Sequence, residues 1–365
     1  MRIFKLIITL ILVTSSLFSQ VKKDRFSNIQ TDFFIGKNIE HDKILKDAID
    51  GTAYGVLISW NTVSSENSKF NKLYNFPERG FSFIYQNLNS SVLGEVYGAY
   101  RHFTYNLTPS KKNQLALTTG FGIGYANKKY HAVTNPKNHA ISSELLVTAY
   151  LRLQYFKILN KQNISINSSI GLLHFSNTAF KNPNLGINTL TLNLGVNYKL
   201  RPIDFQEQDD SFEKIDSKIN YNLILRAGYN ESKEIGSGLF PFYTVSAYGE
   251  KKLNHYSTVT AGIDFYNSKF LKKYIETQNT KNGTNFDETN IFRGGIFIGH
   301  ELAQNHFTFI SQLGYTFYSP YVYISRIYER FGIKYKLSRH LFAEATLKVN
   351  LFRAEAFELG IGYKF

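Results

Sequence analysis

The stretch LALTTGFGIGY, residues 115–125, alternates between large apolar residues and small or polar residues at every second position. One set holds leucine, phenylalanine, isoleucine and tyrosine, whereas the other holds alanine, threonine and glycine. Because side chains of a β-strand point alternately to its two faces, this pattern predicts a strand with two different faces. Segments 189–200, 331–337 and 357–365 repeat the pattern.

Strand length distinguishes a membrane barrel from a soluble β-sandwich. The strands of a sandwich also alternate between apolar and polar residues, because one face of each sheet packs into the shared core. Segments 142–158 and 218–231 exceed the roughly 5–6 residues of most globular strands. They are long enough for the roughly 9–11 residues that a tilted strand needs to cross a bilayer, and the remaining residues would extend the strand beyond it. The sequence also ends on an aromatic strand with Tyr363 and Phe365, which resembles the assembly signal of bacterial outer-membrane barrels. We therefore predict an all-β fold, a transmembrane antiparallel β-barrel.

The number of strands and barrels is a separate question. Eight candidate strands fall between residues 30 and 200 and eight between 217 and 365, and short or doubtful candidates widen the prediction to 12–16 strands. The acid-rich connection 201–216 is either a turn within one barrel or a seam between two eight-stranded units. We predict one barrel over residues 20–365, because two closed barrels on one chain are rare.

The N-terminus, MRIFKLIITLILVTSSLFSQ, has the pattern of a secretory signal peptide. Arg2 and Lys5 form a basic start, 6–13 is an apolar segment too short to span a membrane as a helix, and Ser19 offers a small residue for cleavage. We predict a signal peptide over residues 1–19 and an exported mature chain.

Composition agrees with a barrel. The chain has 31 Phe and 25 Tyr but one Trp and 7 Pro, and its mean hydropathy is −0.24. Transmembrane barrels combine low hydropathy with many aromatics, because each strand puts half its residues into lipid and carries aromatic girdles. The absence of cysteine excludes a disulfide framework. A net charge of +14 indicates an anionic partner. Nucleic acid is the least expected of the anionic partners, because the chain is expected to be exported. The same charge would also arise if the polar loops were simply rich in Lys and Arg.

A histidine and a serine interrupt an apolar strand face. In the segment 164–176, the row that begins with isoleucines continues to His174 and Ser176, and on the returning strand Asn188 shares its face with leucines. A nucleophile, a base and an orienting group therefore converge on the lipid-facing wall at the neck of one hairpin. Polar decoration at the membrane interface would give the same spacing.

The segment HFSNTAFKNPNLGIN, residues 174–188, resembles the active-site segment of the lipid A 3-O-deacylase family (PagL type), also described as acyloxyacyl hydrolases. These outer-membrane barrels remove an ester-linked acyl chain from lipid A. The resemblance lies within residues 30–200 and implies that Ser176 is the nucleophile and His174 its general base. It implies an oxyanion site formed by three residues, Asn177, Thr178 and Asn184.

One position departs from the family pattern. The third member is usually Glu fourteen residues after the His, and here that position is Asn188. An amide oxygen accepts a hydrogen bond from the imidazole but does not offset the charge of the imidazolium. In the trypsin example, replacing the triad Asp with Asn costs about 10⁴ in rate. Either activity is weak, another acid assists, or the site tolerates Asn.

The resemblance also implies the partners. Lipid A, the membrane anchor of lipopolysaccharide, is the expected substrate, and the outer membrane of a Gram-negative-type bacterium the expected location. Lys181 at the same rim is expected to pair with a lipid A phosphate, although a solvated loop lysine would look the same. Ester hydrolysis by Ser and His requires no cofactor, and no metal site is predicted. The alternative is a non-catalytic outer-membrane channel or structural barrel.

Overall fold

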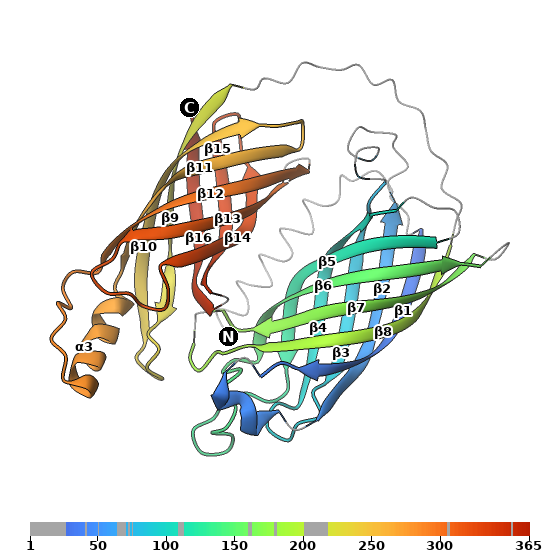
Figure 1. The fold of residues 1–365 in the computed structure, drawn as a ribbon, viewed down its shortest axis with the longest axis horizontal. Helices are drawn as coiled ribbons and strands as arrows, with labels where there is room; N and C mark the ends of the chain where they lie inside the picture. Colours follow the sequence, from blue (N-terminus) through green and yellow to red (C-terminus); the bar gives the residue numbers. More distant parts are fainter. Residues whose placement is uncertain are drawn as a thin grey trace.

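The computed structural model describes residues 27–40, 42–49, 51–63, 71, 74, 76–108, 113–159, 163–178, 181–200, 218–304, 307–351 and 353–365. Within these ranges the chain forms sixteen β-strands in two closed antiparallel barrels (Figure 1). The predicted signal peptide, residues 1–19, and the acid-rich connection 201–216 lie outside the described residues.

The first barrel is built by β1 Asn28–Asn38, β2 Thr52–Val63, β3 Glu78–Asn87, β4 Glu95–Asn106, β5 Asn113–Ala126, β6 Leu145–Ile158, β7 Ile164–Ser176 and β8 Ile187–Lys199. A 3₁₀ helix, η2 Lys43–Ala48, lies between β1 and β2. Each strand pairs with the next, and β1 pairs with β8 from Asn28–Lys199 to Asn38–Thr189, which closes the barrel.

The second barrel is built by β9 Ile219–Glu231, β10 Leu239–Lys252, β11 Ser257–Ser268, β12 Phe292–Gln304, β13 Phe307–Tyr318, β14 Ile327–Lys336, β15 Leu341–Asn350 and β16 Arg353–Lys364. One α-helix, α3 Phe270–Asn282, lies between β11 and β12. Pairing of β16 with β9 closes this barrel. The connection between β11 and β12 therefore contains a helix.

The all-β transmembrane-barrel prediction is confirmed with sixteen strands, but the prediction of one barrel is wrong. Alternation along a strand is a local property and is the same in one sixteen-stranded barrel as in two of eight. Closure depends on which strand edges meet, and here β8 returns to β1 rather than continuing to β9.

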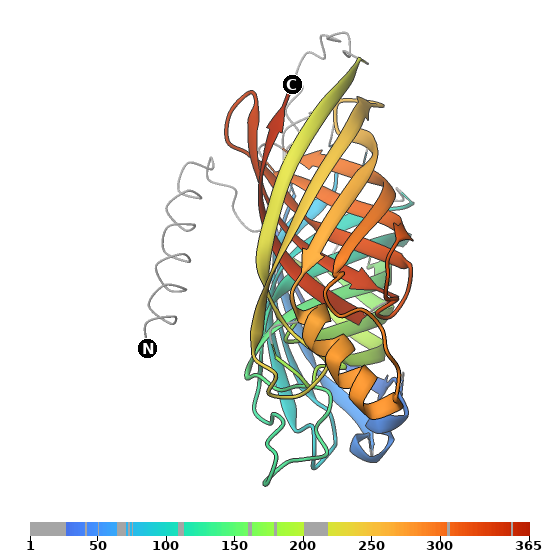
Figure 2. The same ribbon diagram turned by 90° about the vertical axis from the view of Figure 1, so that its left-hand side faces the viewer.

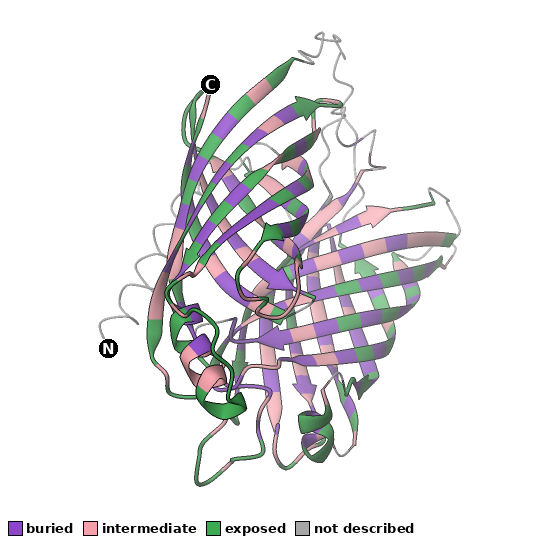
Figure 3. Ribbon diagram, turned by 60° about the vertical axis from the view of Figure 1, so that its left-hand side comes forward, coloured by how far each residue is buried: buried purple, intermediate pink, exposed green. Residues whose placement is uncertain are grey.

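The outer walls are apolar and the interiors are filled. Along each strand exposed and buried residues alternate (Figure 3), and the exposed ones are mainly Leu, Ile, Val, Phe and Tyr. Eight strands enclose a space that side chains fill, which explains why the inward residues are buried. An apolar exterior around a filled interior is the distribution of a barrel surrounded by lipid. Among the described residues, no helix is both long and apolar enough to cross a membrane.

The interior of the first barrel has two layers. An apolar cluster lies toward the end that carries η2 and includes Leu45, Ala48 and Phe175. Toward the other end Arg152 forms an ion pair with Asp32 at 2.9 Å, and Gln154 joins the same buried network. Glu144, in contrast, is exposed because it precedes β6 in a surface loop.

Both barrels place their longer connections at one end. Figures 1 and 2 show η2 and α3 at the same end of the molecule. In the first barrel the connection 127–144 and the β7–β8 neck join this end, while β1 enters and β8 leaves at the opposite end. We call the end with η2 and α3 the loop end.

Candidate active site

The hairpin β7–β8 positions His174 and Asn188 directly opposite each other. The register pairs His174 with Asn188 and, two residues further from the neck, Leu172 with Leu190. Leu172 is 41% exposed and Leu190 50%, so this row lies on the outer wall. His174 and Asn188 continue the row to the loop end and are half-buried.

A short hydrogen bond joins the two side chains. His174 Nδ1 lies 2.7 Å from Asn188 Oδ1. Because an amide oxygen only accepts, the ring nitrogen donates, which places the proton on Nδ1 and turns Nε2 away from Asn188. The backbone of β7 is also held from inside the barrel, where Thr148 Oγ1 donates to the His174 carbonyl oxygen at 2.7 Å. The imidazole is therefore oriented by a neutral partner.

Ser176 lies beside this pair at the last position of β7 and is buried, at 5% exposure. Gly186 shows how closely the groups converge: a Cβ placed there would lie 3.1 Å from His174 Cε1 and 3.5 Å from Ser176 Cβ. Gly186 also has φ +76°, a conformation that L residues rarely adopt. A glycine is therefore required at this position both for backbone conformation and for space.

The turn after Ser176 is tied to the neighbouring loop through Asn177, which is buried. Its Nδ2 donates to Ser142 Oγ at 3.1 Å and to the Lys181 carbonyl oxygen at 2.7 Å. Ser142 Oγ donates to the same Lys181 carbonyl at 3.0 Å. The Asn177 side chain thus holds the turn, which sequence reasoning had not assigned.

Asn184 clamps the backbone that follows Ser176. Its Oδ1 accepts from the Asn177 backbone N–H at 3.0 Å, and its Nδ2 donates to the Thr178 carbonyl oxygen. Thr178 has φ +55° in the left-handed region, unusual for a β-branched residue and frequent at functional turns. The three predicted oxyanion residues are therefore adjacent, with the Asn177 N–H engaged by Asn184; their role stays a prediction.

Basic side chains line the same rim. Lys181 is exposed beside the turn. Lys129 forms an ion pair with Glu144 at 2.7 Å, and Lys128 Nζ donates to the Ser91 carbonyl oxygen at 2.6 Å. The Lys181 carbonyl oxygen accepts from Asn177 and Ser142 in the turn that follows Ser176, and the role of the Lys181 side chain toward a phosphate stays a prediction.

A shallow apolar hollow lies on the outer wall below the site. It has a volume of about 720 Å³ and is lined by exposed residues of the first barrel that include Phe33, Ile170, Leu192 and Leu194. Ile170 and Leu192 are paired on β7 and β8, four residues from His174 and Asn188. At about 3.3 Å per residue the hollow begins roughly 13 Å from the imidazole along the strands.

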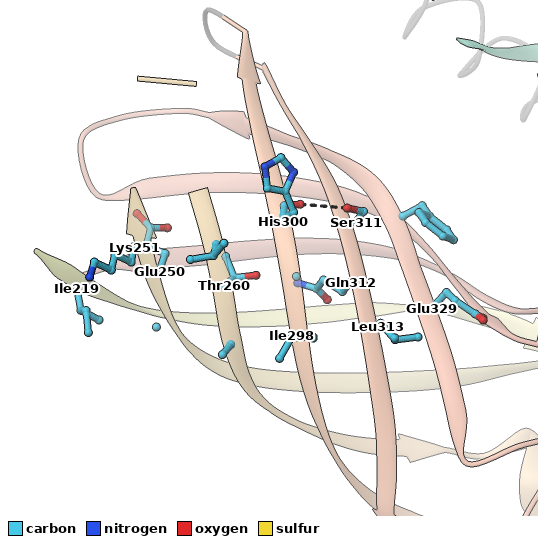
Figure 4. Close-up of a pocket in the computed structure, with 15 residues that line it drawn as sticks. Ile219, Glu250, Lys251, Thr260, Ile298, His300, Ser311, Gln312, Leu313 and Glu329 are labelled. Atoms are coloured by element: carbon cyan, nitrogen blue, oxygen red, sulfur yellow. Dashed lines mark hydrogen bonds between the residues drawn. The ribbon is translucent and has the colours of Figure 1, made fainter. Parts of the chain in front are cut away.

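A second hollow, of about 810 Å³, lies on the second barrel across β10–β14 (Figure 4). His300 lines it and its Nε2 lies 2.6 Å from Ser257 Oγ, whereas neighbouring Glu301 points inward to Lys334. His300 and Glu301 thus face opposite sides of β12. Across the described ranges, no group of three or more His, Cys, Asp or Glu side chains is placed to hold a metal ion.

The fold and the site together define a membrane-embedded barrel with a His–Asn pair on its outer wall beside a buried serine. The profile of the lipid A 3-O-deacylase (PagL) family matches residues 54–197, and that of the acyloxyacyl hydrolase C-terminal domain matches residues 219–365. The chain belongs to this family. Membership supports a role as an ester hydrolase acting on lipid A at the bacterial outer membrane.

Porins are among the solved structures similar to the chain. A triple mutant of the Rhodopseudomonas blastica porin is 11% identical, covers 93% of this chain and 99% of its own, and has a TM-score of 0.20. The KdgM porin is 10% identical, covers 73% of this chain and 93% of its own, and also has a TM-score of 0.20. No curated protein matches the chain.

Proposed function

We propose that the chain is an outer-membrane lipid A deacylase in which Ser176 is the nucleophile, His174 the general base and Asn188 the group that orients His174. The observation that carries this proposal is the 2.7 Å contact between His174 Nδ1 and Asn188 Oδ1 beside Ser176 on the outer wall. A proton fixed on Nδ1 leaves Nε2 in the form that accepts a proton from a serine hydroxyl.

The reaction follows from these positions. His174 takes the Ser176 proton as Ser176 Oγ attacks the ester carbonyl carbon, and returns it to the leaving sugar oxygen. Water activated by His174 then hydrolyses the acyl-serine and releases a fatty acid. We assign two donors to the developing oxyanion, the Thr178 backbone N–H and the Asn184 Nδ2 hydrogen not bonded to the Thr178 carbonyl. The left-handed backbone of Thr178 supports this assignment, because it redirects the chain two residues after the nucleophile.

The location of the site suits a membrane lipid. The acyl chain of lipid A runs down the outer wall, where the hollow lined by Ile170 and Leu192 offers an apolar surface. The phosphorylated sugars then lie at the loop end of the barrel, near Lys181. This places the loop end in the outer leaflet of a Gram-negative-type outer membrane, with lipopolysaccharide as the partner and no cofactor.

The alternative of a non-catalytic channel is less well supported. Eight-stranded barrels enclose a space that side chains fill. The described interiors hold an apolar cluster and buried ion pairs such as Arg152–Asp32 and Arg330–Asp264.

The test is a comparison of lipid A from cells that express the wild type or Ser176→Ala, analysed by mass spectrometry. We expect loss of one hydroxyacyl chain with the wild type and intact lipid A with Ser176→Ala, at equal amounts of folded barrel. Identical spectra for both proteins would rule out hydrolysis by Ser176.

A further inference from the structure

The loop that follows the catalytic serine is bonded to the second barrel. The backbone N–H of Asn182 donates to Glu231 Oε2 at 2.5 Å, and Asn182 Nδ2 donates to the Ser232 carbonyl oxygen at 2.7 Å. Glu231 is the last residue of β9 and is 9% exposed, and Ser232 is fully buried. A buried carboxylate that accepts from a backbone N–H forms one of the stronger hydrogen bonds in proteins.

Glu231 is itself held in place. Its second oxygen, Oε1, accepts from the Gly236 backbone N–H at 3.1 Å, which ties the carboxylate to its own β9–β10 loop. One carboxylate therefore bridges two loops, one from each barrel. This bridge, Glu231 and Ser232 bonded to Asn182, is called the latch below.

The latch acts on the segment that shapes the site. Asn182 lies between Lys181, whose carbonyl oxygen is bonded to Asn177, and Asn184, whose side chain clamps the backbone after Ser176. A movement of Asn182 is therefore transmitted in both directions along the turn toward the same two residues, Asn177 and Thr178.

The other contacts between the barrels are consistent with this arrangement. At the loop end Arg353 of β16 forms an ion pair with Asp42 beside η2 at 3.1 Å. At the opposite end the rings of Phe103 and Phe309 pack edge to face, with centroids 5.4 Å apart. The first contact joins the loop ends of the two barrels and the second joins their opposite ends. The two barrels therefore lie side by side with the same orientation.

We infer that Glu231 is a positioning residue for the active site of the first barrel, and that the second barrel serves to hold the Ser176 turn in its hydrolytic conformation. This inference rests on the proposed function. It assigns the second barrel a task that the chemistry at His174 and Ser176 does not require by itself, because no residue of the second barrel is needed for proton transfer.

The test uses the full chain in lipid A-containing vesicles, with Glu231→Ala and Glu231→Gln. We expect kcat to fall about 10-fold or more with Glu231→Ala, because small displacements of reacting groups cost this much, while KM is unchanged. Glu231→Gln, which keeps one acceptor oxygen, restores part of the rate. Hydrogen exchange at residues 181–186 becomes faster in Glu231→Ala, with the strands of both barrels unchanged.

The matched control is Glu234→Ala in the same β9–β10 loop. Glu234 pairs with Lys281 within the second barrel at 2.9 Å and bonds to none of the described residues of the first. We expect wild-type kcat and wild-type exchange at 181–186 from this control.

Two outcomes separate the latch from the proposed function. An active wild type with equal kcat and equal loop exchange in Glu231→Ala overturns the latch and leaves the function standing. An inactive wild type would overturn the proposed function. The latch is then tested by hydrogen exchange at residues 181–186 alone. Faster exchange in Glu231→Ala than in the wild type supports the latch as a structural contact, and equal exchange overturns the latch.

Discussion

At the level of single residues, the unusual feature is an amide at position 188, where the sequence resemblance leads us to expect a carboxylate. Asn188 Oδ1 accepts from His174 Nδ1 at 2.7 Å and so fixes the tautomer and orientation of the ring. An amide carries no charge, and it does not stabilise the imidazolium that forms when the serine gives up its proton. The hydrogen bond that orients the ring is present, and the negative charge of a carboxylate is absent.

Asn188→Asp and Asn188→Glu test this directly. Asp keeps the length of the side chain and Glu restores the family residue, so we expect at least one of them to raise kcat by about 10-fold or more, by offsetting the imidazolium charge. Asn188→Ala should lower kcat, because the ring loses its orienting partner. Release of fatty acid from purified lipid A measures all three, and equal rates for Asn, Asp and Glu would mean that charge at this position does not limit the reaction.

Gly186 is the second residue-scale test. Gly186→Ala places a methyl group 3.1 Å from His174 Cε1 and strains a backbone with φ +76°. Gly283→Ala, at the end of α3, is the matched control, since it has φ +64° but no atom within 4 Å of the added Cβ. Each substitution costs about 1–2 kcal/mol of stability through its φ. We expect a large loss of kcat with Gly186→Ala only, and a similar loss in both variants would mean that strain rather than contact with His174 matters.

At the level of elements, the turn between β7 and β8 is ordered by side-chain amides. Asn177 and Asn184 bond to backbone groups within the turn, and Asn177 also reaches Ser142 before β6. These contacts satisfy polar backbone groups that the ladder of β7 and β8 no longer pairs. They explain why an asparagine-rich segment forms a fixed site rather than an irregular connection.

Asn177→Ala should therefore loosen the turn. Removal of a buried side chain that bonds three groups costs about 1–3 kcal/mol and leaves the Lys181 carbonyl with one donor fewer. We expect faster hydrogen exchange at residues 177–186 and a lower kcat. Asn282→Ala, at the exposed end of α3, serves as the control and should change neither. Wild-type exchange in Asn177→Ala would contradict the role given to this side chain.

At the level of the whole molecule, the two barrels have different interiors. The first combines an apolar cluster with the Arg152–Asp32 ion pair. The second is held by a charge network in which Arg330 bonds both Asp264, at 2.9 Å, and Glu358, at 2.6 Å. Two separately closed units with separate cores are expected to unfold separately.

Arg330→Met tests this independence. Removal of one partner leaves two buried carboxylates uncompensated, so the second barrel should lose about 3–5 kcal/mol. The single tryptophan, Trp60, lies on β2 and reports the first barrel alone. In urea titrations we expect the circular dichroism of Arg330→Met to show an early transition while Trp60 fluorescence keeps its wild-type midpoint. Lys281→Met, at an exposed ion pair, should change stability by about 1 kcal/mol or less. A matching shift of Trp60 fluorescence would show that the barrels unfold as one unit.

The sequence by itself determined the strands, their lipid-facing side and the segment that contains the site. Alternation and strand length are local, and they predicted a barrel of 12–16 strands and the outward row that reaches His174 and Ser176. The short motif at 174–188 indicated the protein family, and the profile matches confirm that family.

Only the tertiary structure decided what depends on contacts between distant residues. Closure into two barrels depends on the pairing of β1 with β8 and of β9 with β16, and no local pattern encodes which edges meet. The contact of Glu231 with Asn182 joins residues of different barrels. Sequence periodicity reports the two faces of one strand, whereas closure and the latch depend on how whole strands and barrels are placed in space.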